Sequence, residues 1–408
     1  RLQRSGRRSD RGDRSLYQKD RKGEIMMEKH SRVYAEIDLD AISYNMEQMK
    51  KRVGEGAKFI AVVKTDGYGH GAVPIACMLD DDPDVWGYAT ATLEEAVELH
   101  RAGIQKPTMV LGCVFPDQYE EMIKEEVRAT VYTLDMAQEI SNLARKLGKT
   151  AYFHIKIDTG MERLGFPATE ESADLIGQIE KLPNVCLEGM FTHFAKADEL
   201  DKTFSEEQYR KFVWMRNEVE KRGISISQYH CDNSAGIIDF PQWKQNLVRA
   251  GIALYGLYPS EEVKKETVDL KPALRLVSHV SFVKEVEPGA SISYGGTFTA
   301  DKKMKVATIP VGYGDGYARG LSNRGEVLIR GKRARILGRV CMDQFMVDVT
   351  DIPDTVFMDE VVLIGRDGDD EITVEELSEI CGRFNYEFVC CLGKRIPRVY
   401  KGSNLLEK

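Results

Sequence analysis

The stretch VVKTDGYGHG, residues 62–71, places Lys64 at the end of an apolar run, directly before a turn that is rich in glycine. The apolar run, residues 59–63, reads as a buried strand. In a barrel of parallel strands the active site lies at this end of the strands. A lysine there that is partly removed from water has a lowered pKa and can form a Schiff base with a carbonyl compound. A plain surface lysine is the simpler alternative, but three glycines within residues 67–71 exceed what a simple turn needs.

Seven further apolar runs follow, separated by amphipathic helical patterns. A first helix, for which Asp40 is the expected N-cap, precedes all eight runs. Eight strands alternating with helices over roughly 220 residues predict an α/β fold of the (β/α)8 TIM-barrel type, with a doubly wound open sheet as the alternative. The expected strands are residues 59–63, 85–90, 108–111, 130–133, 151–157, 185–192, 226–231 and 247–253.

After about residue 270 the pattern changes to successive β-rich runs with Gly, Pro and Asp turns between them. One late helix is expected over residues 374–381. The sequence therefore predicts two domains, a (β/α)8 barrel over residues 33–266 and a mostly β C-terminal domain over residues 267–408.

The charge of the chain is unevenly distributed. The 408 residues include 57 Lys+Arg and 65 Asp+Glu, a formal net charge of −8. Residues 1–25 carry nine basic and four acidic residues, a net charge of +5, so residues 26–408 carry −13. Such an acidic body argues against a nucleic-acid-binding protein. No apolar stretch of ~18 residues is present, so we expect no membrane span.

Residues 1–25 have no hydrophobic periodicity and are rich in Arg, Asp, Ser and Gly. We expect a disordered leader left over from expression, with a basic arm for an anionic partner as the functional alternative. The eight cysteines are scattered without a Cys-x-x-Cys pair, which predicts reduced thiols, a cytoplasmic location and no metal site.

From about residue 33 to its end the chain resembles the alanine racemases. The resemblance implies pyridoxal 5′-phosphate as cofactor, a fold-type-III barrel with a β domain, and a homodimer whose active sites are shared between subunits. It also implies a small amino-acid substrate and a role in supplying D-alanine for peptidoglycan. The motifs that carry it, besides residues 62–71, are IKIDTGMERLGF (155–166), MFTHFAKADE (190–199), HCDNSAG (230–236), NLVRAGIALYG (246–256), SISYGGTF (291–298), VGYGDGYAR (311–319), GRVCMDQFMVDVT (338–350), FNYEF (384–388) and RIPRVY (395–400).

Racemisation needs one base on each face of the α-carbon. By resemblance Lys64 binds the cofactor and supplies one base, and Tyr294 of the partner subunit supplies the other. The resemblance also places His193 behind Tyr294, and Arg163 near both the phenol and the cofactor. Taken alone, Tyr294 would more simply be an aromatic residue of a β-hairpin.

Six residues besides Lys64 match the family's cofactor-binding positions. Arg249 matches the residue that faces the pyridine nitrogen, where arginine can only donate a hydrogen bond. Its apolar context predicts burial, and a buried arginine needs partners. Ser234 could also be an ordinary helix N-cap. The remaining matches to the phosphate and ring contacts are Tyr68, Gly251, Ile252 and Tyr386.

The substrate carboxylate is expected to meet Met342 and Asp343 of the partner subunit, together with Arg163. Lys156 matches a lysine that is carbamylated in several alanine racemases, and an unmodified lysine is the alternative. The sequence departs from the family signature at Thr65, Gly67 and Asp232, none of which removes a catalytic group.

Three functions stay open at this point. An alanine racemase is expected first, and a racemase of serine or of broader specificity is the alternative within the family, because a pocket discriminates weakly against one extra hydroxyl. A non-catalytic protein that binds pyridoxal phosphate, or a decarboxylase of the same barrel type, belongs to a different class.

Overall fold

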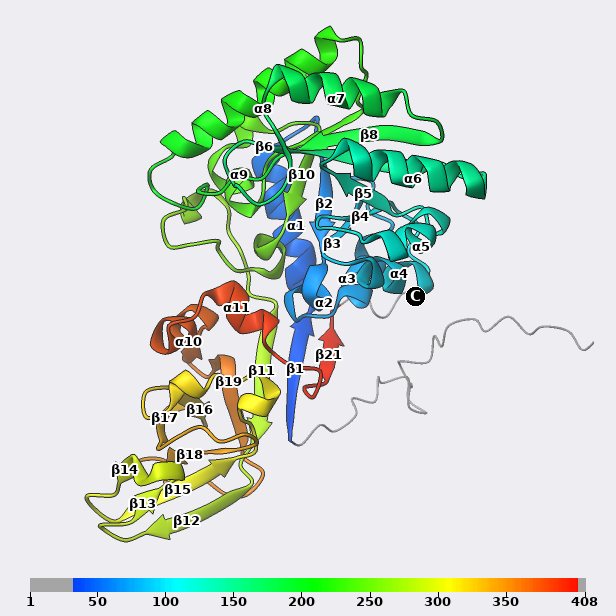
Figure 1. Ribbon diagram of the computed structural model, residues 1–408. Helices are drawn as coiled ribbons and strands as arrows, with labels where there is room; N and C mark the ends of the chain where they lie inside the picture. Colours follow the sequence, from blue (N-terminus) through cyan, green and yellow to red (C-terminus); the bar gives the residue numbers. More distant parts are fainter. Residues whose placement is uncertain (1–31, 403–408) are drawn as a thin grey trace, which may run out of the picture.

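The structure, a computed structural model, describes residues 32–402. The expected leader, residues 1–25, lies outside the described residues. In Figure 1 the helix-covered barrel forms the upper part of the molecule and the β-rich C-terminal part lies below it. No helix in the described range is long and apolar enough to cross a membrane.

Eight parallel strands close into a barrel, which confirms the predicted fold class. The strands pair in sequence order, β5 pairs with β6, and β10 returns to pair with β2. These closing pairs rule out the open doubly wound sheet. The strands are β2 (Lys58–Val62), β3 (Val85–Thr90), β4 (Thr108–Val110), β5 (Arg128–Val131), β6 (Ala151–Asp158), β8 (Val185–Phe191), β9 (Gln228–His230) and β10 (Leu247–Ala250).

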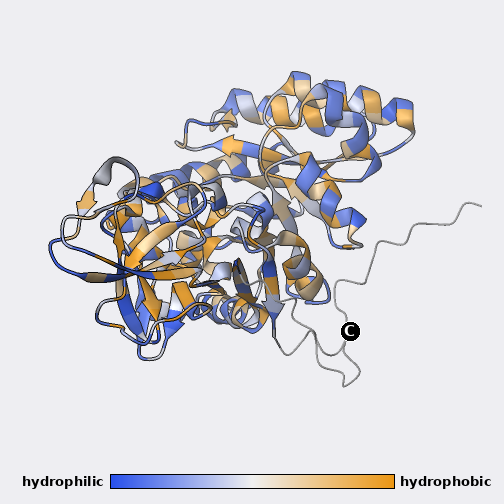
Figure 2. Cartoon of the chain, turned by 90° about the horizontal axis from the view of Figure 1, so that it is seen from below, coloured by the Kyte–Doolittle hydropathy of each residue, from blue (hydrophilic) through white to orange (hydrophobic). Residues whose placement is uncertain are grey.

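Helices connect the barrel strands and cover them on the outside. Figure 2 shows hydrophilic and hydrophobic residues mixed along these helices, as expected for helices with one face on a core. Thr92, Thr133 and Thr169 cap three of them by accepting a backbone N–H. The helices are α1 (Leu39–Val53), α2 (Lys64–Tyr68), α3 (Ala72–Leu79), α4 (Leu93–Arg101), α5 (Tyr119–Lys124), α6 (Leu134–Leu147), α7 (Glu170–Glu180), α8 (Thr203–Lys221) and α9 (Ser234–Asp239).

The N-cap of α1 is Asp38, so the prediction of Asp40 was wrong. Asp38 Oδ1 accepts the backbone N–H of Ala41 at 3.0 Å, and Asp40 lies within the first turn. The physical reason is strand β1 (Val33–Asp38), which runs up to Asp38 and sets where the helix begins.

Strand β1 pairs antiparallel with β11 and parallel with β21, and not with a barrel strand. Residues 33–38, which the sequence assigned to the barrel domain, therefore form part of the C-terminal sheet. The sheet runs in the order β12-β15-β18-β17-β16-β19-β11-β1-β21, with β20 on β19. Its strands are β11 (Leu274–His279), β12 (Phe282–Val286), β15 (Met304–Ile309), β16 (Glu326–Ile329), β17 (Lys332–Leu337), β18 (Phe345–Asp348), β19 (Glu360–Asp367), β20 (Asp370–Ile372) and β21 (Arg398–Lys401).

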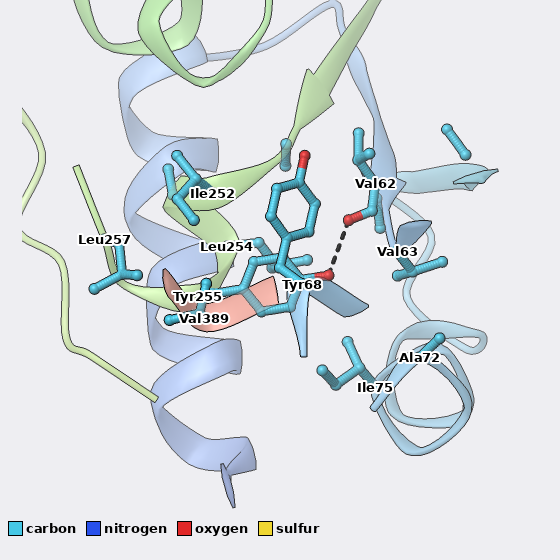
Figure 3. Close-up of a cluster of buried hydrophobic side chains, with 14 of the residues drawn as sticks. Val62, Val63, Tyr68, Ala72, Ile75, Ile252, Leu254, Tyr255, Leu257 and Val389 are labelled. Carbon is cyan, nitrogen blue, oxygen red and sulfur yellow. Dashed lines mark hydrogen bonds between the residues drawn. The ribbon is translucent and has the colours of Figure 1, made fainter. Parts of the chain in front are cut away.

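Two helices of the C-terminal part stand next to the barrel, α10 (Val374–Cys381), as predicted, and α11 (Asn385–Cys390). Val389 of α11 belongs to the buried cluster drawn in Figure 3, together with Val62 and Tyr255 of the barrel. Tyr255 Oη donates to the carbonyl oxygen of Val62 at 2.9 Å. Helix α11 approaches residues 64–71 so closely that a Cβ on Gly69 would lie 2.2 Å from the carbonyl oxygen of Val389.

Candidate active site

A cavity of about 380 Å³ opens at the carboxyl ends of the barrel strands and is closed on one side by helix α11. It brings together most of the residues that the sequence singled out. Its lining includes Lys64, Tyr68, His193, Ser234, Arg249, Gly251, Ile252 and Tyr386, with Val62, Thr65, Leu111, Asn233, Glu387 and Cys390 between them.

Lys64 lies two residues after the last residue of β2 and begins a left-handed turn. Thr65, Asp66 and Gly67 have φ values of 54°, 50° and 61°. Two carboxylates hold this costly conformation: Thr65 N donates to Glu95 Oε1 at 2.6 Å, and Ala72 N donates to Asp66 Oδ1 at 2.9 Å. Burial, and next the nearby charge of Arg163, lower the pKa of Lys64. The turn therefore presents a lysine that loses its proton, and so becomes nucleophilic, more readily than an exposed lysine does.

Ser234 and Gly251 form a small polar cradle at one end of the cavity. Ser234 Oγ accepts the backbone N–H groups of Gly251 at 3.0 Å and Ala253 at 3.2 Å. The hydroxyl hydrogen then remains to donate into the cavity. The N-cap of α9 is Asn233, which accepts from Gly236 N, so Ser234 is not the cap that the simpler alternative required. A Cβ on Gly251 would lie 3.2 Å from Tyr68 Oη, so a side chain here would crowd this space. Neutral donors around an open space suit a phosphate group.

Arg249 lies on β10 with 2% of its surface exposed. Its guanidinium donates to His230 Nδ1 at 2.8 Å and to the carbonyl oxygens of Thr192 at 2.9 Å and Cys231 at 2.8 Å. It also lies 3.2 Å from His193 Nδ1. Burial lowers its pKa to about 10, which still leaves it charged at neutral pH. These partners satisfy the expectation that a buried arginine must be paired, and they fit a role as a fixed hydrogen-bond donor to a ring nitrogen.

Three further residues that the sequence singled out differ in how deeply they are buried near Arg249: His193, Lys156 and Arg163. Burial and the charge of Arg249 lower the pKa of His193 well below its usual value, so the imidazole is neutral. Lys156 is 2% exposed, and burial lowers its pKa to about 7. Arg163 is exposed and does not line the cavity. Its backbone N–H is tied to Asp158 Oδ2 at 3.2 Å, and its charge still lowers the pKa of Lys64, Lys156 and His193.

Tyr294, Met342 and Asp343 line a second cavity, of about 610 Å³, formed by the C-terminal part of the chain. The two cavities share no lining residue. Tyr294 is 71% exposed, and Asp343 Oδ1 accepts from Arg395 Nη2 at 2.8 Å. Within one chain the structure therefore separates the two predicted bases, Lys64 and Tyr294.

Sequence reasoning missed Cys390, which lines the first cavity, and several residues that support the lining from behind. Glu95 reaches the turn after Lys64 from the first turn of the neighbouring helix α4, and Cys390 lies on α11. His154 and Glu188 stand behind His230. The sequence does offer one signal for His154 and Glu188, because each interrupts an apolar strand run. A polar or charged residue inside a barrel strand needs a partner, so these two positions indicate buried polar contacts.

Comparison with known proteins is consistent with this geometry. Residues 37–259 match the family model described as "Alanine racemase, N-terminal domain", and residues 273–400 match "Alanine racemase, C-terminal domain". The chain belongs to the alanine racemase family. It is thus a member of a family of isomerases.

Individual proteins resemble the chain over nearly its full described length. An alanine racemase of Clostridium tetani is 46% identical, covering 92% of this chain and 97% of that protein. The solved alanine racemase of Clostridium difficile superimposes with a TM-score of 0.89 at 41% identity, covering 92% and 97% of the two chains. A histidine racemase of Leuconostoc mesenteroides has a TM-score of 0.84 at 25% identity, covering 92% and 99%.

Proposed function

We propose that this protein is a pyridoxal-phosphate-dependent racemase that interconverts L- and D-alanine. The observation that carries the proposal is the single cavity in which Lys64, the buried donor Arg249 and the Ser234–Gly251 cradle meet. Membership in the alanine racemase family supports the same reaction.

Pyridoxal phosphate bound through Lys64 supplies an electron-withdrawing ring that acidifies the α-hydrogen of an amino acid. Ser234, Gly251 and Ile252 would hold its phosphate, with Tyr68 and Tyr386 beside them. Arg249 would donate to the ring nitrogen without protonating it, because arginine keeps its proton. We expect this weaker electron withdrawal to suppress side reactions such as transamination.

Inversion at the α-carbon requires that a proton leaves one face and another arrives on the opposite face. Lys64 is suited to one face, because burial favours its neutral amine. We assign the other face to the phenol of Tyr294 from a partner subunit, assisted by His193 and Arg163. Arg163 and the backbone at Met342 and Asp343 would receive the substrate carboxylate. The exposure of Tyr294 in its own chain supports a homodimer with shared active sites.

We assign the product, D-alanine, to peptidoglycan synthesis in the cytoplasm. A racemase of serine or of broader specificity is the alternative, and the similar fold of a histidine racemase favours testing it. The decisive assay follows the loss of optical rotation from a panel of L-amino acids, with pyridoxal phosphate added. Equal or faster turnover of serine or histidine would contradict alanine as the main substrate.

The shared site is tested by mixing two inactive variants, Lys64→Ala and Tyr294→Phe. After dissociation and random reassociation we expect about a quarter of the wild-type rate, because half of the dimers are mixed and each contains one complete site. Tyr44→Phe, a change on the barrel helix α1, is the control and should stay active alone. If the mixture remains inactive while mixed dimers form, each site is built within one chain.

A further inference from the structure

A chain of hydrogen-bonded side chains leads from Arg249 through the barrel interior to Arg128. Arg249 Nη1 lies 2.8 Å from His230 Nδ1, and His230 Nε2 lies 3.0 Å from His154 Nδ1. His154 Nε2 lies 3.1 Å from Glu188 Oε2. Glu188 in turn accepts from Arg128 through both carboxylate oxygens, at 3.0 and 3.3 Å. The five residues stand on β10, β9, β6, β8 and β5, so the hydrogen-bond chain links five of the eight barrel strands, which neighbour one another.

The two ends of this chain determine where its hydrogens lie. Arg249 is a donor only, so His230 must accept at Nδ1 and carry its hydrogen at Nε2. His230 Nε2 then donates to His154 Nδ1, and His154 carries its own hydrogen at Nε2. At the far end, burial alone would raise the pKa of Glu188, but hydrogen bonds from His154 and Arg128 lower it to about 2. A carboxylate in this state can only accept, so every bond is donated toward Glu188.

The packing around the two histidines leaves room for this hydrogen-bond chain and keeps it from water. Both histidine side chains are fully buried, and burial is the first cause that lowers their pKa values, so both rings are neutral. The His230 ring stacks on Phe191 at 4.6 Å with an angle of 7° between the planes. The β6–β8 register shifts between Phe153 and His154, where the histidine ring enters the core. Only the Glu188–Arg128 end approaches the surface, with each side chain 16% exposed.

We infer that Glu188 and Arg128 are positioning residues that fix the tautomers of His154 and His230 and thereby hold the Arg249 guanidinium in place in the active-site cavity. The step from Arg249 to catalysis rests on the proposed function. A neutral amide at position 188 could donate to His154 Nε2 and permit the reverse tautomers. His230 would then present an N–H to the N–H of Arg249, and that hydrogen bond would be lost.

The first test is nitrogen-15 NMR of the protein labelled at histidine. In the wild type we expect His154 and His230 to be neutral, with hydrogen at Nε2 and an unprotonated Nδ1. Signals showing hydrogen at Nδ1 of either residue, or a charged ring, would overturn the inference without any variant. Because the measurement needs neither substrate nor turnover, it stands apart from the racemase assay.

The second test compares Glu188→Gln with Glu218→Gln. Glu218 is a matched control, because its side chain is 12% exposed and it pairs with Arg222 at 2.9 Å, but it contacts no histidine. We expect Glu188→Gln to produce mixed or reversed tautomers at both histidines and Glu218→Gln to leave them unchanged. Unchanged tautomers in a folded Glu188→Gln protein would contradict the role of the carboxylate.

The catalytic consequence has its own measurement. With pyridoxal phosphate bound, Glu188→Gln should lower kcat by about tenfold, the effect of one lost hydrogen bond, and leave the KM for alanine unchanged. Its visible absorption should also shift relative to the wild type, which a loss of stability alone would not cause. If the tautomers are as expected but no amino acid is racemised, the proposed function fails and the hydrogen-bond chain stands. If racemisation is confirmed but His154 carries its hydrogen at Nδ1, only the inference fails.

Discussion

Gly189 on β8 lies directly against the His154 ring on β6. A Cβ at position 189 would come within 2.2 Å of His154 Nδ1. We therefore expect Gly189→Ala to displace the histidine and destabilise the protein by about 2–3 kcal/mol, in the range of overpacked cores. Thermal unfolding measures this, and Gly177→Ala is the control, since its Cβ would meet Ile224 at an ordinary 3.5 Å. Equal melting temperatures for the two variants would show that the barrel absorbs the added methyl group.

Arg249→Lys tests whether stability and cofactor binding depend on the several N–H donors of the guanidinium and not only on its charge. Arg249 donates to a histidine and to two carbonyl oxygens, one in the β9–α9 loop and one in the β8–α8 loop, which a single ammonium group cannot span. Unsatisfied buried acceptors should cost about 1–3 kcal/mol in urea unfolding. Affinity for pyridoxal phosphate should fall as well. Arg216→Lys, on the surface of α8, should change neither quantity. Wild-type stability in Arg249→Lys would mean that the acceptors find other donors.

Much of the fold could be predicted because barrel strands are buried on both faces and read as continuous apolar runs. The predicted strand bounds and sheet membership were wrong where contacts with distant residues, and not the local sequence pattern, determine the structure. Strand β5 begins at Arg128, earlier than the expected residue 130, because the charge of Arg128 is matched by Glu188 from another strand. Likewise β1 alternates buried and half-buried residues, which does not reveal the sheet it joins.

The candidate site likewise contains residues that the local sequence pattern predicts and residues that only tertiary packing brings in. Residues that lie shortly after barrel strands, such as Lys64 and Ser234, could be predicted, because parallel strands bring their carboxyl ends together. Cys390 and Glu95 could not, because tertiary packing alone carries Cys390 to the cavity and Glu95 to the turn after Lys64. The sequence also did not show which partners these polar residues have, since His154 and His230 stand far apart along the chain and share no local pattern.

Lys156 is expected to carry a carbamate. Burial is the main cause that lowers its pKa to about 7, opposed by Asp158 and aided by Arg249 and Arg163. A large neutral fraction above pH 7 can react with dissolved CO2, and the two arginines would favour the resulting negative charge. Carbon-13 NMR with labelled bicarbonate should show a carbamate signal that rises between pH 6 and 8. The signal should be absent from Lys156→Gln and present in Lys196→Gln, an exposed control. No signal at pH 8 would establish the unmodified amine.

Asp232 makes the protein less stable as pH rises. Its side chain is buried beside α9, and within residues 32–402 its Oδ2 has no hydrogen-bond partner. Burial, only partly offset by Arg249, raises the pKa of this carboxyl from 3.8 to about 7. Between pH 4 and 7 the native state therefore keeps a proton that the unfolded chain has lost, and stability falls with rising pH.

Asp232→Asn removes this dependence, because an amide of the same shape stays neutral. We expect its melting temperature to match the wild type near pH 4, to exceed it increasingly up to pH 7, and to keep a constant advantage above that. The advantage corresponds to a difference in the free energy of unfolding of the order of 4 kcal/mol. Asp117→Asn, on the protein surface, should follow the wild-type curve throughout. An advantage that shrinks with rising pH would mean that Asp232 is ionised and paired in the native state, with Arg249 as the charge that holds it.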